Sequence, residues 1–210
     1  MSDSMWSVLA ESARDQWEAT PLVGVGPLQF GMTRGQVTAA LGRGPAMSSG
    51  DSAAYPPSDP RAWGNMLVAY FRAATADDVP PDLPGRSLTG GIDDGYEYQP
   101  GHRLGGVLAA VAVDARFGPQ VRWEGLALTG RVPSATDDAV YAKLRDRGMG
   151  EQIRFSQEGT YSYGEIGLLL RVQRAGDILL TRPVFAAPAW VERLGDTSEG
   201  PLPDQEWHSH

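Results

Sequence analysis

The sequence predicts an α+β protein in which short, capped helices pack on an antiparallel β-sheet. Two observations support this fold class: the spacing of a capping box occurs at two separate places, and several apolar or alternating segments of strand length occur between turn residues. A third is the high content of turn formers, with 26 Gly and 16 Pro among 210 residues. Whether two tandem helix-on-sheet repeats or one continuous domain carries these elements stays open.

Two helices are predicted in the first quarter of the chain. Residues 4–17 have apolar residues on one side at helical spacing, and Ser4 can cap them. The clearer signal follows at 31–42. There Thr33 and Gln36 have the spacing of a capping box, and Gly42 can take the left-handed conformation that ends a helix.

A third helix is predicted to begin at Ser134, with Asp137 three residues later, and to end near Arg147, before Gly148. Its inward positions would be Val140 and Leu144.

The remaining regular structure is predicted to be strand. Residues 104–117 are apolar on both alternations, as in a central strand covered on both faces, and they should form a hairpin with 120–130 about Gly118-Pro119. A tight turn at 174–176 should join the last two strands. The predicted strands are 66–73, 104–117, 120–130, 153–156, 166–173 and 177–185, with an extended piece at 23–30 and long loops at 43–62 and 75–102.

Both halves of the chain have the same predicted order of elements: a strand, then a helix that ends at a glycine, then antiparallel strands. This order is compatible with an internal duplication or with one mixed domain. The predicted organisation is an N-terminal helix in 1–20, a first helix-plus-sheet unit in 21–130, a second in 131–190 and an acidic tail in 191–210.

Composition excludes several classes of function. The chain has no cysteine, which rules out disulfides, thiolate zinc sites and cysteine nucleophiles. Its start has no basic residues before an apolar run, and no stretch reaches about 18 apolar residues, so we expect a cytoplasmic protein that does not span a membrane. The formal net charge of -8 argues against a nucleic-acid partner.

The negative charge is concentrated in two segments. Residues 75–102 contain six acids and one arginine, and residues 191–210 contain five acids and one arginine. Everything else in the chain is close to neutral. Aromatic residues between carboxylates, such as Tyr96 beside Glu97, are typical of protein interfaces, where acids steer a basic partner. The candidate partner-binding residues are Asp77, Asp78, Asp93, Asp94, Tyr96, Glu97, Tyr98 and Trp63; the alternative is a solvated acidic loop.

Two further classes of function stay open. Asp93, Asp94, Glu97 and His102 could serve a small metal-dependent hydrolase, but they match neither a zinc pattern nor a calcium loop, so we predict no metal and no cofactor. A small-molecule or peptide-binding module would instead need an apolar cleft on the sheet, lined by residues such as Trp123 and Tyr70.

Residues 30–37 with Leu41-Gly42 resemble the F/L-G-M-T-x-x-x-V-x-x-x-L-G signature of a family that includes the SmpA/OmlA (BamE-like) outer-membrane assembly lipoproteins and the secreted β-lactamase inhibitor proteins. The resemblance implies a helical pair on a small antiparallel sheet that presents a face and loops to another protein. Those proteins carry an acylated cysteine or disulfides, and this chain has neither.

The chain is also loosely similar to bacterial immunity proteins. We therefore expect a non-catalytic protein-binding module, an inhibitor or immunity protein that masks a basic partner such as a nuclease.

Overall fold

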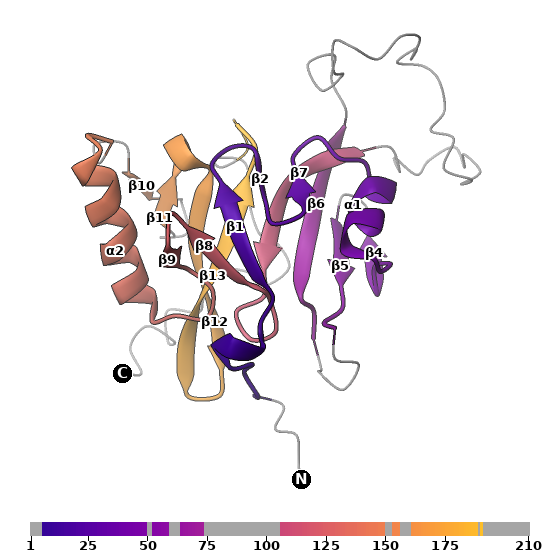
Figure 1. Ribbon diagram of the computed structural model, residues 1–210, viewed down its shortest axis with the longest axis horizontal. Helices are drawn as coiled ribbons and strands as arrows, with labels where there is room; N and C mark the ends of the chain where they lie inside the picture. The colour runs from indigo at the N-terminus through magenta and orange to yellow at the C-terminus, as the bar shows by residue number, and fades with distance from the viewer. Residues whose placement is uncertain are drawn as a thin grey trace.

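In the part of the chain that the structure describes, there are a large and a small β-sheet, and two helices lie beside the small sheet (Figure 1). The computed structural model describes residues 6–49, 52–58, 64–73, 106–149, 153–155, 161–188 and 190. The large sheet has eight strands in the order β10-β11-β12-β13-β7-β6-β5-β4, all antiparallel to their neighbours. The predicted α+β class is confirmed.

The predicted central strand is confirmed as β7, which lies between β6 and β13. Residues 107–113 of β7 are buried, as the apolar run on both alternations predicts. Because β7 pairs with β13, strands from both sides of residue 130 belong to one sheet. The strands of this sheet are β4 (Met47–Ser49), β5 (Ser52–Tyr55), β6 (Leu67–Ala73), β7 (Gly106–Val113), β10 (Ile153–Phe155), β11 (Tyr161–Tyr163), β12 (Leu168–Ala175) and β13 (Ile178–Ala186).

The predicted loop at 43–62 is wrong in part, because β4 and β5 lie within it and extend the sheet from β6. Small residues at 52–54 weaken the strand signal, yet two of the three are buried by pairing with β6. The predicted tight turn between β12 and β13 is confirmed: Ala175 pairs with Ile178, and Gly176 between them has a φ of 65°.

The predicted hairpin about Gly118-Pro119 is wrong. The Asp114 carboxylate accepts the N–H groups of Arg116 and Phe117, both at 2.8 Å, and this turn carries the chain out of the large sheet. The next strand joins the small sheet instead, where β8 pairs in parallel with β1. The small sheet has the order β3-β2-β1-β8-β9, from β1 (Gln16–Thr20), β2 (Gly24–Val25), β3 (Leu28–Gln29), β8 (Gln120–Trp123) and β9 (Leu126–Ala127).

Helix α1 (Arg34–Leu41) begins and ends where the sequence predicts. Thr33 and Gln36 form a reciprocal capping box, and Gly42 takes the left-handed conformation with a φ of 65°. The second predicted helix is α2 (Pro133–Asp146), but its predicted capping box at Ser134 is wrong. The helix starts one residue earlier because Pro133 occupies the first turn, where its missing N–H costs nothing, and Val132 precedes it.

The predicted helix at 4–17 is wrong throughout its described part. Residues 6–17 contain one 3-10 turn, η1 (Glu11–Ala13), and the start of β1. Tertiary contacts decide this: the N–H of Leu9 donates to the carbonyl of Arg116 at 2.9 Å, and Trp17 packs against the main core from β1. A short 3-10 turn, η3 (Gly164–Ile166), also precedes β12.

The main core lies between one face of the large sheet and a layer formed by α1, α2 and the small sheet. Figure 1 shows α2 and α1 at opposite sides of the view, with β1 and β8 between them. Each part of that layer contributes to the core: α1 through Val37, α2 through Val140 and the small sheet through Trp123. A second, smaller cluster lies on the other face of the sheet, around Ala110, Leu169 and Val184. Within the described ranges, no helix is long and apolar enough to cross a membrane.

Two glycines with the same backbone conformation provide a matched test of this packing. Gly167 and Gly42 both have a φ of 65°, but a Cβ on Gly167 would overlap the carbonyl oxygen of Ala186, whereas a Cβ on Gly42 would meet open space. Gly42→Ala should therefore cost about 1–2 kcal/mol for the left-handed conformation alone. Gly167→Ala should cost about 1–3 kcal/mol more, because backbone must move.

Urea unfolding of the two variants measures this difference. Equal losses of stability would contradict the close approach of Gly167 to β13.

Candidate functional site

All eight candidate partner-binding residues lie outside the described residues, and so does His102 of the alternative metal cluster. These residues are Asp77, Asp78, Asp93, Asp94, Tyr96, Glu97, Tyr98 and Trp63. The structure does describe the two points where the chain enters and leaves the acidic segment, which we define as residues 74–105. These points are the ends of β6 and β7.

The acidic segment begins and ends at neighbouring positions of the large sheet. Ala73 is paired with Gly106, and the next pairs inward are Arg72 with Val107 and Phe71 with Leu108. A Cβ on Gly106 would lie 2.9 Å from the carbonyl oxygen of Arg72, so the strands approach closely here. The segment is thus a closed excursion from one point of the sheet.

The chain leading into α1 fastens this point. The N–H of Gly31 donates to the carbonyl of Leu108 at 2.9 Å, and the N–H of Leu108 donates to the carbonyl of Met32 at 2.7 Å. Arg34, the first residue of α1, places its guanidinium 4.2 Å from the centre of the Phe71 ring. Strand pairing and α1 together fix the position at which the acidic segment is attached to the sheet.

The alternative cleft lined by Trp123 and Tyr70 is not formed. Trp123 is buried in the main core, whereas Tyr70 belongs to the cluster on the opposite face of the large sheet. One β-sheet therefore separates the two aromatic residues.

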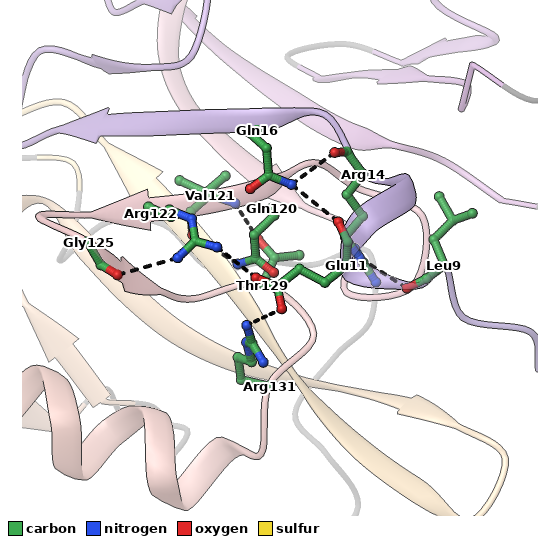
Figure 2. Close-up of polar contacts among 10 residues, drawn as sticks. All are labelled: Leu9, Glu11, Arg14, Gln16, Gln120, Val121, Arg122, Gly125, Thr129 and Arg131. Atoms are coloured by element: carbon green, nitrogen blue, oxygen red, sulfur yellow. Dashed lines mark hydrogen bonds and ion pairs between the residues drawn. The ribbon is translucent and has the colours of Figure 1, made fainter.

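A cluster of hydrogen bonds and ion pairs joins residues 9–16 to residues 120–131 (Figure 2). Arg14 is 7% exposed, and its guanidinium donates to the carbonyls of Gly118 at 2.7 Å, Ala115 at 2.8 Å, Arg116 at 3.0 Å and Leu9 at 3.2 Å. Burial lowers the pKa of Arg14; the nearby Asp114 carboxylate opposes this shift, Arg131 adds to it and Glu11 opposes it.

Glu11 joins two distant parts of the chain within the same cluster. Its Oε1 accepts from Arg122 at 2.7 Å and its Oε2 accepts from Arg131 at 2.5 Å (Figure 2). All three side chains are partly exposed. The cluster thus holds residues 9–14 against the 115–118 turn, β8 and the start of α2. We interpret it as structural, and sequence analysis missed it because its members are separated by more than 100 residues.

A substitution at Arg14 tests this structural role. Arg14→Met keeps the length of the side chain but leaves the carbonyls of Ala115 and Gly118 without a donor. Each buried acceptor left unsatisfied costs about 1–3 kcal/mol, so we expect a loss of about 2–5 kcal/mol. The matched control is Arg122→Met, which removes a half-exposed ion pair worth about 0–1 kcal/mol.

Urea unfolding of both variants measures the two losses. A loss for Arg14→Met no larger than for Arg122→Met would refute the role of Arg14 as the anchor.

Asp137 and Tyr163 form a second polar contact that the sequence does not indicate. The hydroxyl of Tyr163, a residue buried in β11, donates to the Asp137 carboxylate on α2. Burial raises the pKa of Asp137 from its ordinary 3.8; the bond from Tyr163 opposes that shift and the neighbouring Asp138 adds to it. The pair attaches α2 to β11 at the expense of partly desolvating a carboxylate.

The direction of this pKa shift predicts a pH dependence of stability. Because the pKa of Asp137 is higher in the folded chain than in the unfolded chain, the folded state binds more protons between the two values, and its stability falls as pH rises through that interval. Asp137→Asn should therefore gain stability relative to the parent as pH rises above about 4.

Urea midpoints measured from pH 3 to pH 7 test the prediction. Asp146→Asn is the control, because it removes the same charge from an exposed position of α2. An equal gain in both variants would attribute the effect to net charge rather than to burial.

A pair of buried arginines on the large sheet was also missed. Arg171 of β12 lies directly opposite Arg182 of β13, and both are buried. The turn at Gly176 fixes this register, so the pairing could have been found from the two predicted strands and the turn between them.

No group of three His, Asp or Glu side chains that could hold a metal occurs in the part of the chain that the structure describes. The chain matches no protein-family model, no curated protein and no solved structure.

Proposed function

We propose that this protein is a non-catalytic binding module that presents its acidic segment to a basic partner protein. One observation carries the proposal: Ala73 and Gly106 are paired neighbours, so the segment leaves and re-enters the sheet at one point. A long excursion on a fixed scaffold is the usual arrangement of a binding loop.

The composition of the segment supports a protein as the ligand. Its 75–102 part contains six acids and one arginine, a net charge of -5, together with Tyr96 and Tyr98. Such a charge accelerates the encounter with a basic surface by a factor of about 10 to 10³ at low salt. Tyrosine adds contact area with little loss of side-chain freedom.

The sharpest form of the proposal is an inhibitor or immunity protein that occludes a basic enzyme. The resemblance around residues 30–42 supports it only through the capped helix α1, because the family motif opens a helical pair and here the chain passes from α1 into β4. The acidic segment is the stronger argument.

The pairing of Ala73 with Gly106 allows a clean test. Residues 75–104 are replaced by Asn-Gly, which suits a two-residue hairpin turn between positions 74 and 105. The shortened chain should unfold cooperatively and remain within about 1 kcal/mol of the parent, because a surface loop adds little to stability.

The tagged parent chain and the shortened chain are then used to capture proteins from the native host. We expect a basic protein to co-purify with the parent and to be absent from the shortened chain. The control replaces the five acids of the tail, Glu192, Asp196, Glu199, Asp204 and Glu206, by their amides and should retain the partner. Capture of the same partner by a folded, shortened chain would overturn the assignment.

A further inference from the structure

The face of the large sheet that points away from the helices contains two buried arginines. Side chains alternate along a strand, so Arg171 lies on the same face as Leu169, and Arg182 lies on the same face as Val184. Leu169 and Val184 belong to the smaller core cluster on that face. We call this surface the arginine face and define it by Tyr70, Ala110, Ala112, Leu169, Arg171, Arg182 and Val184.

The two arginines repel each other in the positions they occupy. Arg171 and Arg182 are direct cross-strand partners, which places their Cβ atoms about 4.5–5.5 Å apart. They are only 9% and 4% exposed. Like charges in this position destabilise a sheet, and burial removes the water that would screen them, so pairing with an anionic group would stabilise this arrangement. Both residues do take part in a polar, electrostatic or ring contact.

The apolar residues of the arginine face are covered as well. Leu169 is 1% exposed and Val184 is 0% exposed. Among the described residues, however, α1, α2 and the small sheet all pack on the opposite face of the large sheet. The one described hydrophobic residue from outside the sheet that packs into this cluster is Trp190.

Trp190 also shows where the chain goes after β13. The N–H of Ala187 donates to the carbonyl of Ala109 at 2.8 Å, and the N–H of Trp190 donates to the carbonyl of Ala187 at 3.1 Å. The chain therefore turns at 187–190 and places Trp190 on the arginine face. Residues 191–210, which follow directly, contain five acids and one arginine.

We propose that the acidic tail, residues 191–210, is an intramolecular ligand of the arginine face, with its carboxylates paired to Arg171 and Arg182. Charge complementarity and the position of Trp190 support this occupant. The inference does not depend on the proposed binding of a basic partner, which concerns another segment.

The acidic segment at 74–105 is the rival occupant, and its attachment is less favourable. Val184 is paired with Ala112, which lies six residues along β7 from Gly106. At a rise of about 3.3 Å per residue, the segment starts about 20 Å from Val184, and Arg182 lies farther still along β13. Trp190, in contrast, already contacts the cluster that includes Val184.

The first experiment compares two full-length variants with equal changes of charge. One replaces the five tail acids by amides: Glu192→Gln, Asp196→Asn, Glu199→Gln, Asp204→Asn and Glu206→Gln. The other replaces five acids of the internal segment: Asp77→Asn, Asp78→Asn, Asp82→Asn, Asp93→Asn and Asp94→Asn. We expect the tail variant alone to show a lower urea midpoint, and the difference to shrink in about 1 M salt, where screening is strong.

A third variant tests whether a lower urea midpoint of the tail variant is due to lost pairing with the arginines. Arg171→Gln with Arg182→Gln should remove most of the effect of neutralising the tail, because the groups that the tail binds are then uncharged. An equal effect of the tail substitutions with and without the two arginines would overturn the proposal.

A second experiment locates the tail directly and does not depend on stability. The chain has no cysteine, so a single nitroxide can be attached at Ser198→Cys, or at Gln99→Cys as the control. The label at 198 should broaden the amide signals of residues 169–171 and 182–184, and the broadening should decrease in the tail-neutral variant. Unchanged broadening in that variant, or stronger broadening from position 99, would overturn the proposal.

Discussion

The fold depends on one strand that must be covered on both faces. Residues 107–113 of β7 are buried between β6 and β13, so neither face of the sheet centre can be left to water. The helices and the small sheet cover one face and form the main core. The opposite face is buried as well, and under the proposal above the acidic tail covers it and offsets the charge of its two buried arginines. Both proposals above concern segments attached to this sheet.

Local signals in the sequence were sufficient where neighbours along the chain decide the structure. The capping box of Thr33 and the left-handed Gly42 define α1, and the apolar run at 107–113 defines β7. Distant hydrogen bonds decided the structure elsewhere. The path of residues 9–14 is set by Arg14, whose hydrogen-bond acceptors lie at 115–118. The turn that the Asp114 carboxylate stabilises directs the chain out of the large sheet, so that β8 joins the small one. Those partners cannot be identified from helical or strand periodicity alone.

The candidate site also has one part that the sequence predicts and one part that only the structure shows. Charge and tyrosine content indicate the acidic segment without any knowledge of the fold, but only the register of Ala73 with Gly106 shows that it is attached at one point. The arginine pair was within reach of the sequence, because a tight turn and two strands determine which residues face each other. The burial of the two arginines could not be predicted in this way, because strand pairing does not show what covers that face.

The two acidic segments have different roles under these proposals, and this affects what a partner would encounter. Carboxylates of residues 191–210 that pair with Arg171 and Arg182 would contribute little field at a distance, because each pair is nearly neutral. The charge of -5 in residues 75–102 would remain as the largest part of the net charge of -8. The largest share of the field that a basic protein meets would then come from the segment that β6 and β7 hold at one point of the sheet, and orientation as well as attraction would follow from that attachment.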